Sequence, residues 1–339
     1  MRISRFERPG GRCTRRAGKI RCGAVLLAGC LWGVGCSHPQ PNVVLQKADP
    51  EAGTAAETTS GETAYLVGAG DIAGCQELDG ARATAQLLEK LPGTVFTAGD
   101  LAYEHGSAGE FKNCYGSTWG EFKARTRPTP GNHEYADPNA TGYFHYWGAV
   151  AGPVGKGYYS YELGAWHIVA LNTNCGAKGV GGCEEGSPEE VWLKQDLAAH
   201  PNACIVAYGH HPLFSSGILK SHAMHPELKP LWEDLYAAHA ALVLAGHEHS
   251  YERFAPQNPD GQADPEHGIR EIVVGTGGRS HDPLGFAIAN SEVRNTDTYG
   301  VLKLALSPGK YTWQFIPVEG ETFTDAGSGE CPRGAAAAK

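Results

Sequence analysis

The sequence lacks the features that define several common classes of protein. It has only 2 Met and no run of about 18 apolar residues, which excludes a protein that crosses a membrane several times. Basic residues are outnumbered, with 28 Lys and Arg against 37 Asp and Glu, so a surface for nucleic acid is not expected. The chain has no internal repeat and no Cys-x-x-Cys pair, which makes a cysteine-based zinc site a weak alternative.

The chain nevertheless has enough material for a folded core. Its 339 residues suffice for one large domain or two ordinary ones. The hydrophobic fraction is 41% and the aromatic fraction 9%, which excludes wholesale disorder. The formal charge of −9 at first argues against an anionic substrate.

The N-terminal segment resembles a secretory signal peptide of the lipoprotein type, which we place at residues 1–36. Eight basic residues and one acidic residue precede the short apolar run Cys22–Gly35. This run is too short to span a membrane, and its many glycines and lack of helical periodicity disfavour a buried amphipathic helix. It ends in Leu27-Ala28-Gly29-Cys30 and Gly33-Val34-Gly35-Cys36, and either cysteine is a candidate for lipidation after cleavage.

Export is expected whichever cleavage site is used. Lipidation of Cys30 or Cys36 gives a periplasmic or cell-surface lipoprotein with a possible lipid anchor in the membrane, whereas ordinary cleavage gives a secreted protein. Residues 37–62 are rich in Pro, Ala, Thr, Glu and Gly and predict a flexible linker. We expect one folded domain at residues 63–318 and a Gly/Ala-rich tail at 319–339.

Six cysteines follow Cys36, and an even number in an exported chain indicates disulfide bonds. Cys175 and Cys183 flank a glycine-rich loop and are the first expected pair. Cys75 with Cys114 is the second expected pair.

Short apolar runs alternate with helical stretches along the expected domain. Two helices are predicted, one over Ala81–Leu91 and one that begins after Ser187 and runs to Ala199. Val301–Leu306 and Tyr311–Val318 predict a hairpin. Six runs predict buried strands, and the whole pattern favours an α/β sandwich: Ala64–Ala69, Thr94–Ala98, His167–Leu171, Ala203–Tyr208, Ala240–Ala245 and Glu271–Val274.

Polar residues follow these strands in five places, four of them directly after a predicted strand. Each such turn alone is typical of an ordinary surface loop. Because ligand sites collect at the carboxyl ends of strands in open α/β sheets, five together predict one shared site. The five turns are Gly70-Asp71, Gly99-Asp100-Leu101-Ala102-Tyr103, Gly131-Asn132-His133-Glu134, Gly209-His210-His211-Pro212 and Gly246-His247-Glu248-His249.

The residue types in these turns indicate metal ions. Carboxylate, amide oxygen, imidazole and phenolate suit Fe, Zn or Mn. The donors outnumber the needs of one tetrahedral ion, so two ions that share a carboxylate are expected. His247-Glu248 resembles the start of the metalloprotease motif His-Glu-x-x-His, but Tyr251 stands where the second histidine should be.

The combination resembles the metallophosphoesterase (calcineurin-like) superfamily, and Tyr103 makes it resemble the purple acid phosphatase-like branch. The last motif reads Gly246-His247-Glu248-His249-Ser250-Tyr251-Glu252-Arg253. The resemblance covers roughly residues 64 to 318 and makes residues 63–318 the metallophosphoesterase catalytic domain. It implies a four-layer α/β/β/α sandwich with a dinuclear metal site at the carboxyl ends of the strands.

The resemblance also implies a role for each ligand. Asp71, Tyr103 and His249 would hold one ion, expected to be Fe(III). A second ion, expected to be Fe(II), Zn or Mn, would be held by Asn132, His210 and His247, with Asp100 bridging both ions. The chain departs from the usual Asp-x-Gly of that branch at Asp71-Ile72-Ala73, which puts only the local loop shape in doubt.

The implied function is an exported phosphatase that hydrolyses phosphate monoesters by attack of a metal-bound hydroxide. Its partners would be small phosphate esters, drawn by the two metal ions despite the acidic chain. The catalytic candidates are His133, His211 and His222, with His225 as a further histidine, whereas Tyr251 and Arg253 are expected to support the loop. The alternatives are a phosphodiesterase or nucleotidase with the same site, and a non-catalytic metal-binding surface lipoprotein.

Overall fold

The computed structural model describes residues 62–218 and 224–332. The predicted signal peptide at 1–36, with Cys30 and Cys36, lies outside the described residues, as do His222 and the linker except for its last residue. In the described part of the chain, no helix has both the length and the apolar composition needed to cross a membrane.

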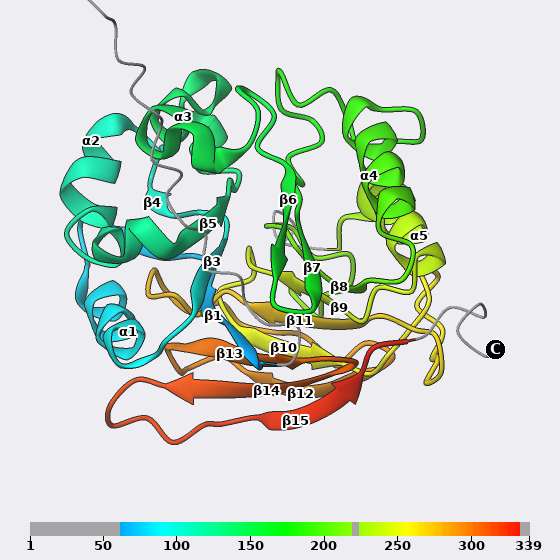
Figure 1. The fold of residues 1–339 in the computed structure, drawn as a ribbon. Helices are drawn as coiled ribbons and strands as arrows, with labels where there is room; N and C mark the ends of the chain where they lie inside the picture. Colours follow the sequence, from blue (N-terminus) through cyan, green and yellow to red (C-terminus); the bar gives the residue numbers. More distant parts are fainter. Residues whose placement is uncertain (1–61, 219–223, 333–339) are drawn as a thin grey trace, which may run out of the picture. The chain divides into compact units, whose positions relative to one another are not determined.

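Most strands belong to two sheets, which the chain builds from interleaved segments (Figure 1). In the six-stranded sheet the order is β15 (Ala326–Glu330), β14 (Lys310–Pro317), β13 (Gly300–Ser307), β1 (Ala64–Ala69), β3 (Thr94–Ala98) and β5 (Thr126–Thr129). In the seven-stranded sheet it is β12 (Ser291–Asn295), β10 (Tyr251–Phe254), β11 (Arg270–Val274), β9 (Leu242–Ala245), β8 (Cys204–Tyr208), β7 (Trp166–Ala170) and β6 (Tyr159–Leu163). A short parallel pair joins β2 (Ala73–Gly74) to β4 (Ala102–Tyr103).

The helices lie on the outer sides of the two sheets (Figure 1). On one side are α1 (Asp79–Lys90), α2 (Ala108–Glu110) and α3 (Thr141–Trp147), and on the other are α4 (Pro188–Ala199) and α5 (Lys229–Ala237). Further helical turns are η1 (Phe111–Tyr115), η2 (Trp119–Arg125), η3 (Glu134–Ala136), η4 (Pro138–Ala140), η5 (Gly148–Ala151) and η6 (Pro226–Leu228). As predicted, Ser187 caps α4, where its hydroxyl oxygen accepts a hydrogen bond from the Glu190 backbone N–H at 3.3 Å.

Side chains that alternate along the central strands of the seven-stranded sheet pack into two separate cores. Ile168, Val206 and Leu244 join the core between the sheets, where the rings of Phe96 and Tyr208 are 5.6 Å apart. Their neighbours Val169, Ile205 and Val243 join a second core with buried residues of the outer helices, including Leu193 and Leu231. The expected four-layer α/β/β/α arrangement is therefore confirmed.

The folded domain continues beyond residue 318, where we had expected a tail. Asp325 accepts hydrogen bonds from the Tyr251 hydroxyl and the Arg253 Nε at 2.7 Å each, and from the Trp313 indole N–H at 3.0 Å. Strand β15 then pairs antiparallel with β14. Small residues in Ala326–Glu330 resembled a tail, but they fit against large ones, because a Cβ on Gly327 would lie 2.3 Å from the Trp313 ring.

Three disulfide bonds join the six cysteines of the domain. Both expected pairs, Cys175–Cys183 and Cys75–Cys114, are confirmed. The third bond, Cys204–Cys331, was not predicted and closes 127 residues of sequence. It ties the end of β15 to the start of β8 in the other sheet, which again makes residues up to 331 part of the domain.

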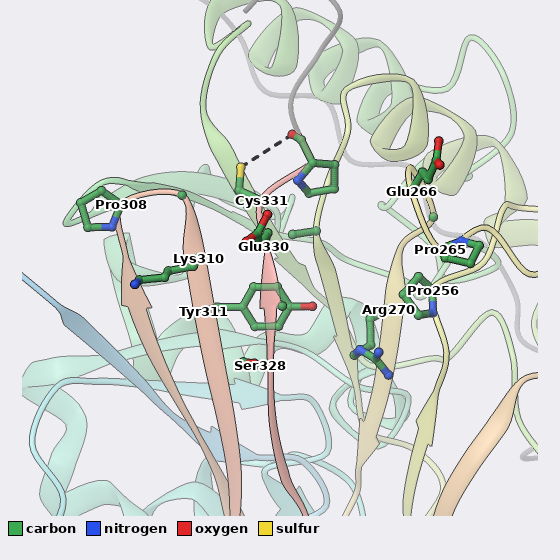
Figure 2. A pocket seen from close by; sticks show the side chains of 15 residues that line it. Pro256, Pro265, Glu266, Arg270, Pro308, Lys310, Tyr311, Ser328, Glu330 and Cys331 are labelled. Atoms are coloured by element: carbon green, nitrogen blue, oxygen red, sulfur yellow. Dashed lines mark hydrogen bonds between the residues drawn. The ribbon is translucent and has the colours of Figure 1, made fainter.

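A cavity of about 820 Å³ lies at the opposite end of the strands from the predicted site. Its lining includes Ala241 and Arg270 at the starts of β9 and β11, and Tyr311 near the turn between β13 and β14. Figure 2 shows Arg270 and Tyr311 extending toward one another across this space. Because none of the seven expected metal ligands lines it, this cavity is not the candidate metal centre.

Candidate metal centre

The two sheets place their polar turns at one shared edge. The six-stranded sheet supplies Asp71, Asp100 and Asn132 after β1, β3 and β5, and the seven-stranded sheet supplies His210 after β8 and His247 after β9. Within each sheet these strands are neighbours and run parallel. Their carboxyl ends therefore meet, as the sequence predicted.

The backbone is unusually bent at three of the expected ligands. Asp71, Asp100 and His247 have φ values of 61°, 51° and 73°, a region that side-chain-bearing residues rarely adopt. Such conformations persist where surrounding contacts fix them, and they are concentrated at functional sites. Gly99, which precedes Asp100, cannot be replaced by a larger residue, because a Cβ there would lie 2.4 Å from the His210 Nδ1.

The first expected ligand group is assembled around the Tyr103 hydroxyl. This oxygen lies 2.9 Å from Asp71 Oδ1, 3.1 Å from Asp100 Oδ2 and 3.1 Å from His249 Nε2. His249 Nε2 lies 3.4 Å from Asp71 Oδ1. Ligand atoms about 2.0–2.2 Å from one ion lie roughly 3 Å apart, so this group has the spacing of a common coordination sphere.

The second expected group is assembled around His210 Nε2. This nitrogen lies 3.0 Å from Asn132 Oδ1 and 3.0 Å from His247 Nδ1. It is also 3.3 Å from Asp100 Oδ2, the same oxygen that contacts Tyr103. One carboxylate oxygen thus belongs to both groups, which is the arrangement that a bridging ligand requires.

The seven expected ligands differ in their exposure to solvent. Six of them are buried, whereas Asn132 is exposed. Burial opposes the charge of Asp100, but the neighbouring His210 lowers the pKa of the Asp100 carboxyl below its ordinary value. Burial likewise opposes the charge of His210, and Asp100 raises the pKa of this imidazole to about 9. A cation beside Asp100 is therefore favourable, and a metal ion fits that requirement.

Hydrogen bonds on the far side of two histidines orient them as ligands. His210 Nδ1 lies 2.9 Å from the Ala98 carbonyl oxygen, which accepts an N–H there and leaves Nε2 free to bind a metal ion once it has lost its proton. His249 Nδ1 lies 2.6 Å from the Ser280 hydroxyl on a loop that follows β11. Metal-binding histidines typically have such partners, which fix the tautomer and the ring orientation.

Glu134 is a residue whose role sequence reasoning missed. Its buried carboxylate accepts four backbone hydrogen bonds, from Asp100 and Gly131 on one oxygen and from Leu101 and Ala102 on the other, at 2.8–3.2 Å. Burial raises the pKa of Glu134 to about 8, with the backbone N–H groups acting in the opposite direction. It joins the loops of two ligands, and its position in Gly131-Asn132-His133-Glu134 was the signal available in the sequence.

The structure brings two of the three catalytic candidates to the centre. His133 packs against Tyr103 with ring centroids 4.3 Å apart, and its Nε2 lies 3.9 Å from Asp100 Oδ2. His211 lies beside His247 with centroids 4.4 Å apart, and burial lowers its pKa well below the ordinary value. The ring centroids of His225 and His247 are 5.1 Å apart, whereas His222 is outside the described residues.

Comparison with known proteins identifies related chains. A family model described as calcineurin-like phosphoesterase matches residues 64–251. The curated relatives include two proteins from Arabidopsis thaliana. One is named "probable inactive purple acid phosphatase 9", is 30% identical over 159 residues, and the match covers 43% of this chain and 22% of that one. The other, purple acid phosphatase 23, is 28% identical over 206 residues, and the match covers 49% of this chain and 43% of that one.

A solved purple acid phosphatase from yellow lupin (Lupinus luteus) seeds has a similar fold. Its TM-score is 0.60 at 18% identity, and the superposition covers 79% of this chain and 54% of that one. At this identity the likeness concerns the fold alone. The chain spans less than half the length of each of the two curated relatives.

Replacement of Glu134 by Gln tests its role in joining the ligand loops. A glutamine amide presents N–H groups to backbone donors, so we expect a loss of about 1–3 kcal/mol in unfolding free energy and a roughly 10–100-fold loss of metal affinity. Elemental analysis and thermal unfolding measure the two effects. Glu190→Gln is the control, because buried Glu190 accepts a backbone hydrogen bond from Gly186 at the start of α4, outside the five ligand turns. Unchanged metal affinity in Glu134→Gln would contradict this role.

Proposed function

The chain belongs to the calcineurin-like phosphoesterase family, on its purple acid phosphatase-like branch, and we propose that it hydrolyses phosphate monoesters with two metal ions. The observation that carries the proposal is the shared Asp100 Oδ2, which lies 3.1 Å from the Tyr103 hydroxyl and 3.3 Å from His210 Nε2. Two ligand groups that meet at one carboxylate oxygen suit a pair of ions.

Each ion has its own ligand set in this proposal. Asp71, Tyr103 and His249 would hold Fe(III), and Asn132, His210 and His247 would hold Fe(II), Zn or Mn, with Asp100 as a ligand to both. When bound, such a pair attracts the phosphate group and lowers the pKa of coordinated water. Burial and the Asp100 and Asp71 carboxylates raise the pKa of Tyr103 well above its ordinary value. A strong Lewis acid on the phenol oxygen would lower that pKa and let the proton leave as the phenolate forms.

His133 is the candidate proton donor to the leaving alcohol. Its Nδ1 lies 2.7 Å from the Glu104 carbonyl oxygen, which fixes the ring and leaves Nε2 on the side of Asp100. Its side chain is 29% exposed, so a substrate can reach it. His211 and His225 lie close enough to the second ligand group to contact the phosphate. His222 stays a candidate on the sequence alone.

We further propose that the protein is exported, either secreted or held as a lipoprotein through Cys30 or Cys36. Three disulfide bonds support this, because such bonds persist in oxidising compartments. Small phosphate esters are the proposed partners.

Replacement of Asp100 by Asn tests the proposed activity. The amide removes the charge shared by the two ligand groups, so we expect hydrolysis of p-nitrophenyl phosphate to be abolished. Release of p-nitrophenol measures the rate, and the exposed Asp79→Asn is the control. Retained hydrolysis in Asp100→Asn would rule out this centre. A wild-type protein that hydrolyses only diesters would favour a phosphodiesterase, and one that hydrolyses no ester would favour a metal-binding lipoprotein.

The Fe(III) assignment predicts a coloured protein. A phenolate on ferric iron absorbs visible light, so Tyr103→Phe is expected to lose the absorption band. The control is Tyr135→Phe, which is expected to keep the band, because the hydroxyl of Tyr135 bonds to Asn172. The measurement is the absorption spectrum together with elemental analysis of the purified protein. An active, colourless and iron-free native protein would overturn the ferric assignment.

A leaving-group comparison tests His133. Alkyl alcohols leave poorly without a proton, whereas p-nitrophenolate leaves readily. His133→Ala is therefore expected to slow glycerol 2-phosphate hydrolysis by about 10²–10⁴-fold and to affect p-nitrophenyl phosphate much less. The exposed His145→Ala is the control. An equal loss on both substrates would show that His133 does not donate the proton.

A further inference from the structure

We propose that Arg279 is a substrate-binding residue that makes the centre favour phosphate monoesters, which can carry two negative charges, over diesters, which carry one. The inference rests on the proposed function and adds the residue that distinguishes the two ester classes. It is argued from the position of the guanidinium group at the rim of the centre.

The backbone fixes Arg279 beside the first ligand group. Its N–H donates to the Asp71 carbonyl oxygen at 3.0 Å. The next residue, Ser280, contacts His249 through its hydroxyl at 2.6 Å. The Arg279 side chain therefore starts from a backbone that is bound to one expected ligand and is adjacent to the partner of another.

A glycine leaves room for the side chain to cross the short β2–β4 pair. A Cβ on Gly74 would lie 2.9 Å from Arg279 Cδ and 3.1 Å from its Nε. The guanidinium carbon is 5.1 Å from the centroid of the Tyr103 ring, a distance typical of a cation–π contact. Since the hydroxyl of the same ring contacts Asp71 and Asp100, the positive charge lies at the edge of the centre.

The Arg279 guanidinium pairs with the carboxylate of Glu104. Arg279 and Glu104 form an ion pair, and their side chains are 26% and 44% exposed. The pair is therefore partly exposed to solvent, which limits its contribution to stability. A phosphate oxygen can replace the carboxylate, because the planar guanidinium fork matches both anions.

The same glutamate connects Arg279 to the candidate proton donor. The Glu104 carbonyl oxygen lies 2.7 Å from His133 Nδ1, and the ring of His133 also packs against Tyr103. Arg279 and His133 thus border the same tyrosine. A phosphate bound at the centre has a proton donor and a fixed positive charge within one small region.

The charge of Arg279 favours the more negative substrate. A monoester dianion has one charged oxygen more than a diester with the same leaving group, and this oxygen gains most from a guanidinium in a partly buried site. The ion pair with Glu104 lowers this advantage until substrate displaces the carboxylate. Arg279 therefore acts on the phosphate group itself.

The test compares two substrates with the same leaving group, p-nitrophenyl phosphate and bis(p-nitrophenyl) phosphate. Arg279→Met is expected to lower the monoester-to-diester ratio of kcat/KM by about 10–100-fold, and Arg279→Lys to retain part of the ratio. Arg82→Met is the control, because Arg82 forms an exposed ion pair with Asp79 on α1. Glu104→Gln is expected to lower KM for the monoester, since the competing carboxylate is removed. Elemental analysis of each variant identifies any loss of metal.

Each result decides the proposal. Equal losses on both esters, or an unchanged ratio in Arg279→Met, would overturn it, as would a wild-type preference for the diester. A wild type that hydrolyses neither ester would refute the proposed function instead. In that case, binding of inorganic phosphate by calorimetry is the deciding measurement. Weaker binding to Arg279→Met than to Arg82→Met would support the role of Arg279, and equal binding would refute it.

Discussion

The arrangement of this centre depends on keeping the Asp100 carboxylate charged although it is almost fully buried. One oxygen of this side chain contacts both ligand groups, and the other accepts the backbone N–H of His133 at 2.8 Å. A buried carboxylate is stable only with positive charge or hydrogen-bond donors around it. Asp100 raises the pKa of His210, which favours a positive charge there, and metal ions would replace that charge. The two sheets must therefore meet at this edge.

The sandwich satisfies this requirement through strand direction and packing. Parallel strands at the middle of each sheet end at the same edge, while the core between the sheets fixes their separation. Bent backbone at Asp71, Asp100 and His247 then turns these residues into the shared space. Glu134 holds two of the turns together with four hydrogen bonds. A bent turn has an energetic cost of about 1–3 kcal/mol, which the surrounding contacts must offset.

The parts of the molecule that the sequence predicted are those with local patterns. The apolar runs at Ala64–Ala69 and Thr94–Ala98 are strands with the expected bounds, because burial on both faces demands continuous apolar residues. The seven expected ligands converge because each stands directly after, or close behind, such a strand. Contacts between distant segments carried no local signal. Asp325 lies in the segment predicted to be a tail, yet it bonds to Arg253. Cys204 and Cys331 had no predicted partner, because 127 residues of sequence separate them.

The acidity of the chain becomes compatible with an anionic substrate once distance is considered. Residues 1–36 hold eight basic residues and one acidic residue, so residues 37–339 have a formal charge of −16. At physiological ionic strength the Debye length is about 8 Å, so exposed carboxylates far from the centre are largely screened. Groups within a few ångströms decide the potential that a phosphate meets, and there the chain places histidines and Arg279 beside two carboxylates. Metal ions would reverse the negative electrostatic potential of the carboxylates. Arg279 would add a positive charge that does not depend on metal loading. The negative net charge of the chain therefore does not argue against binding of a phosphate at this centre.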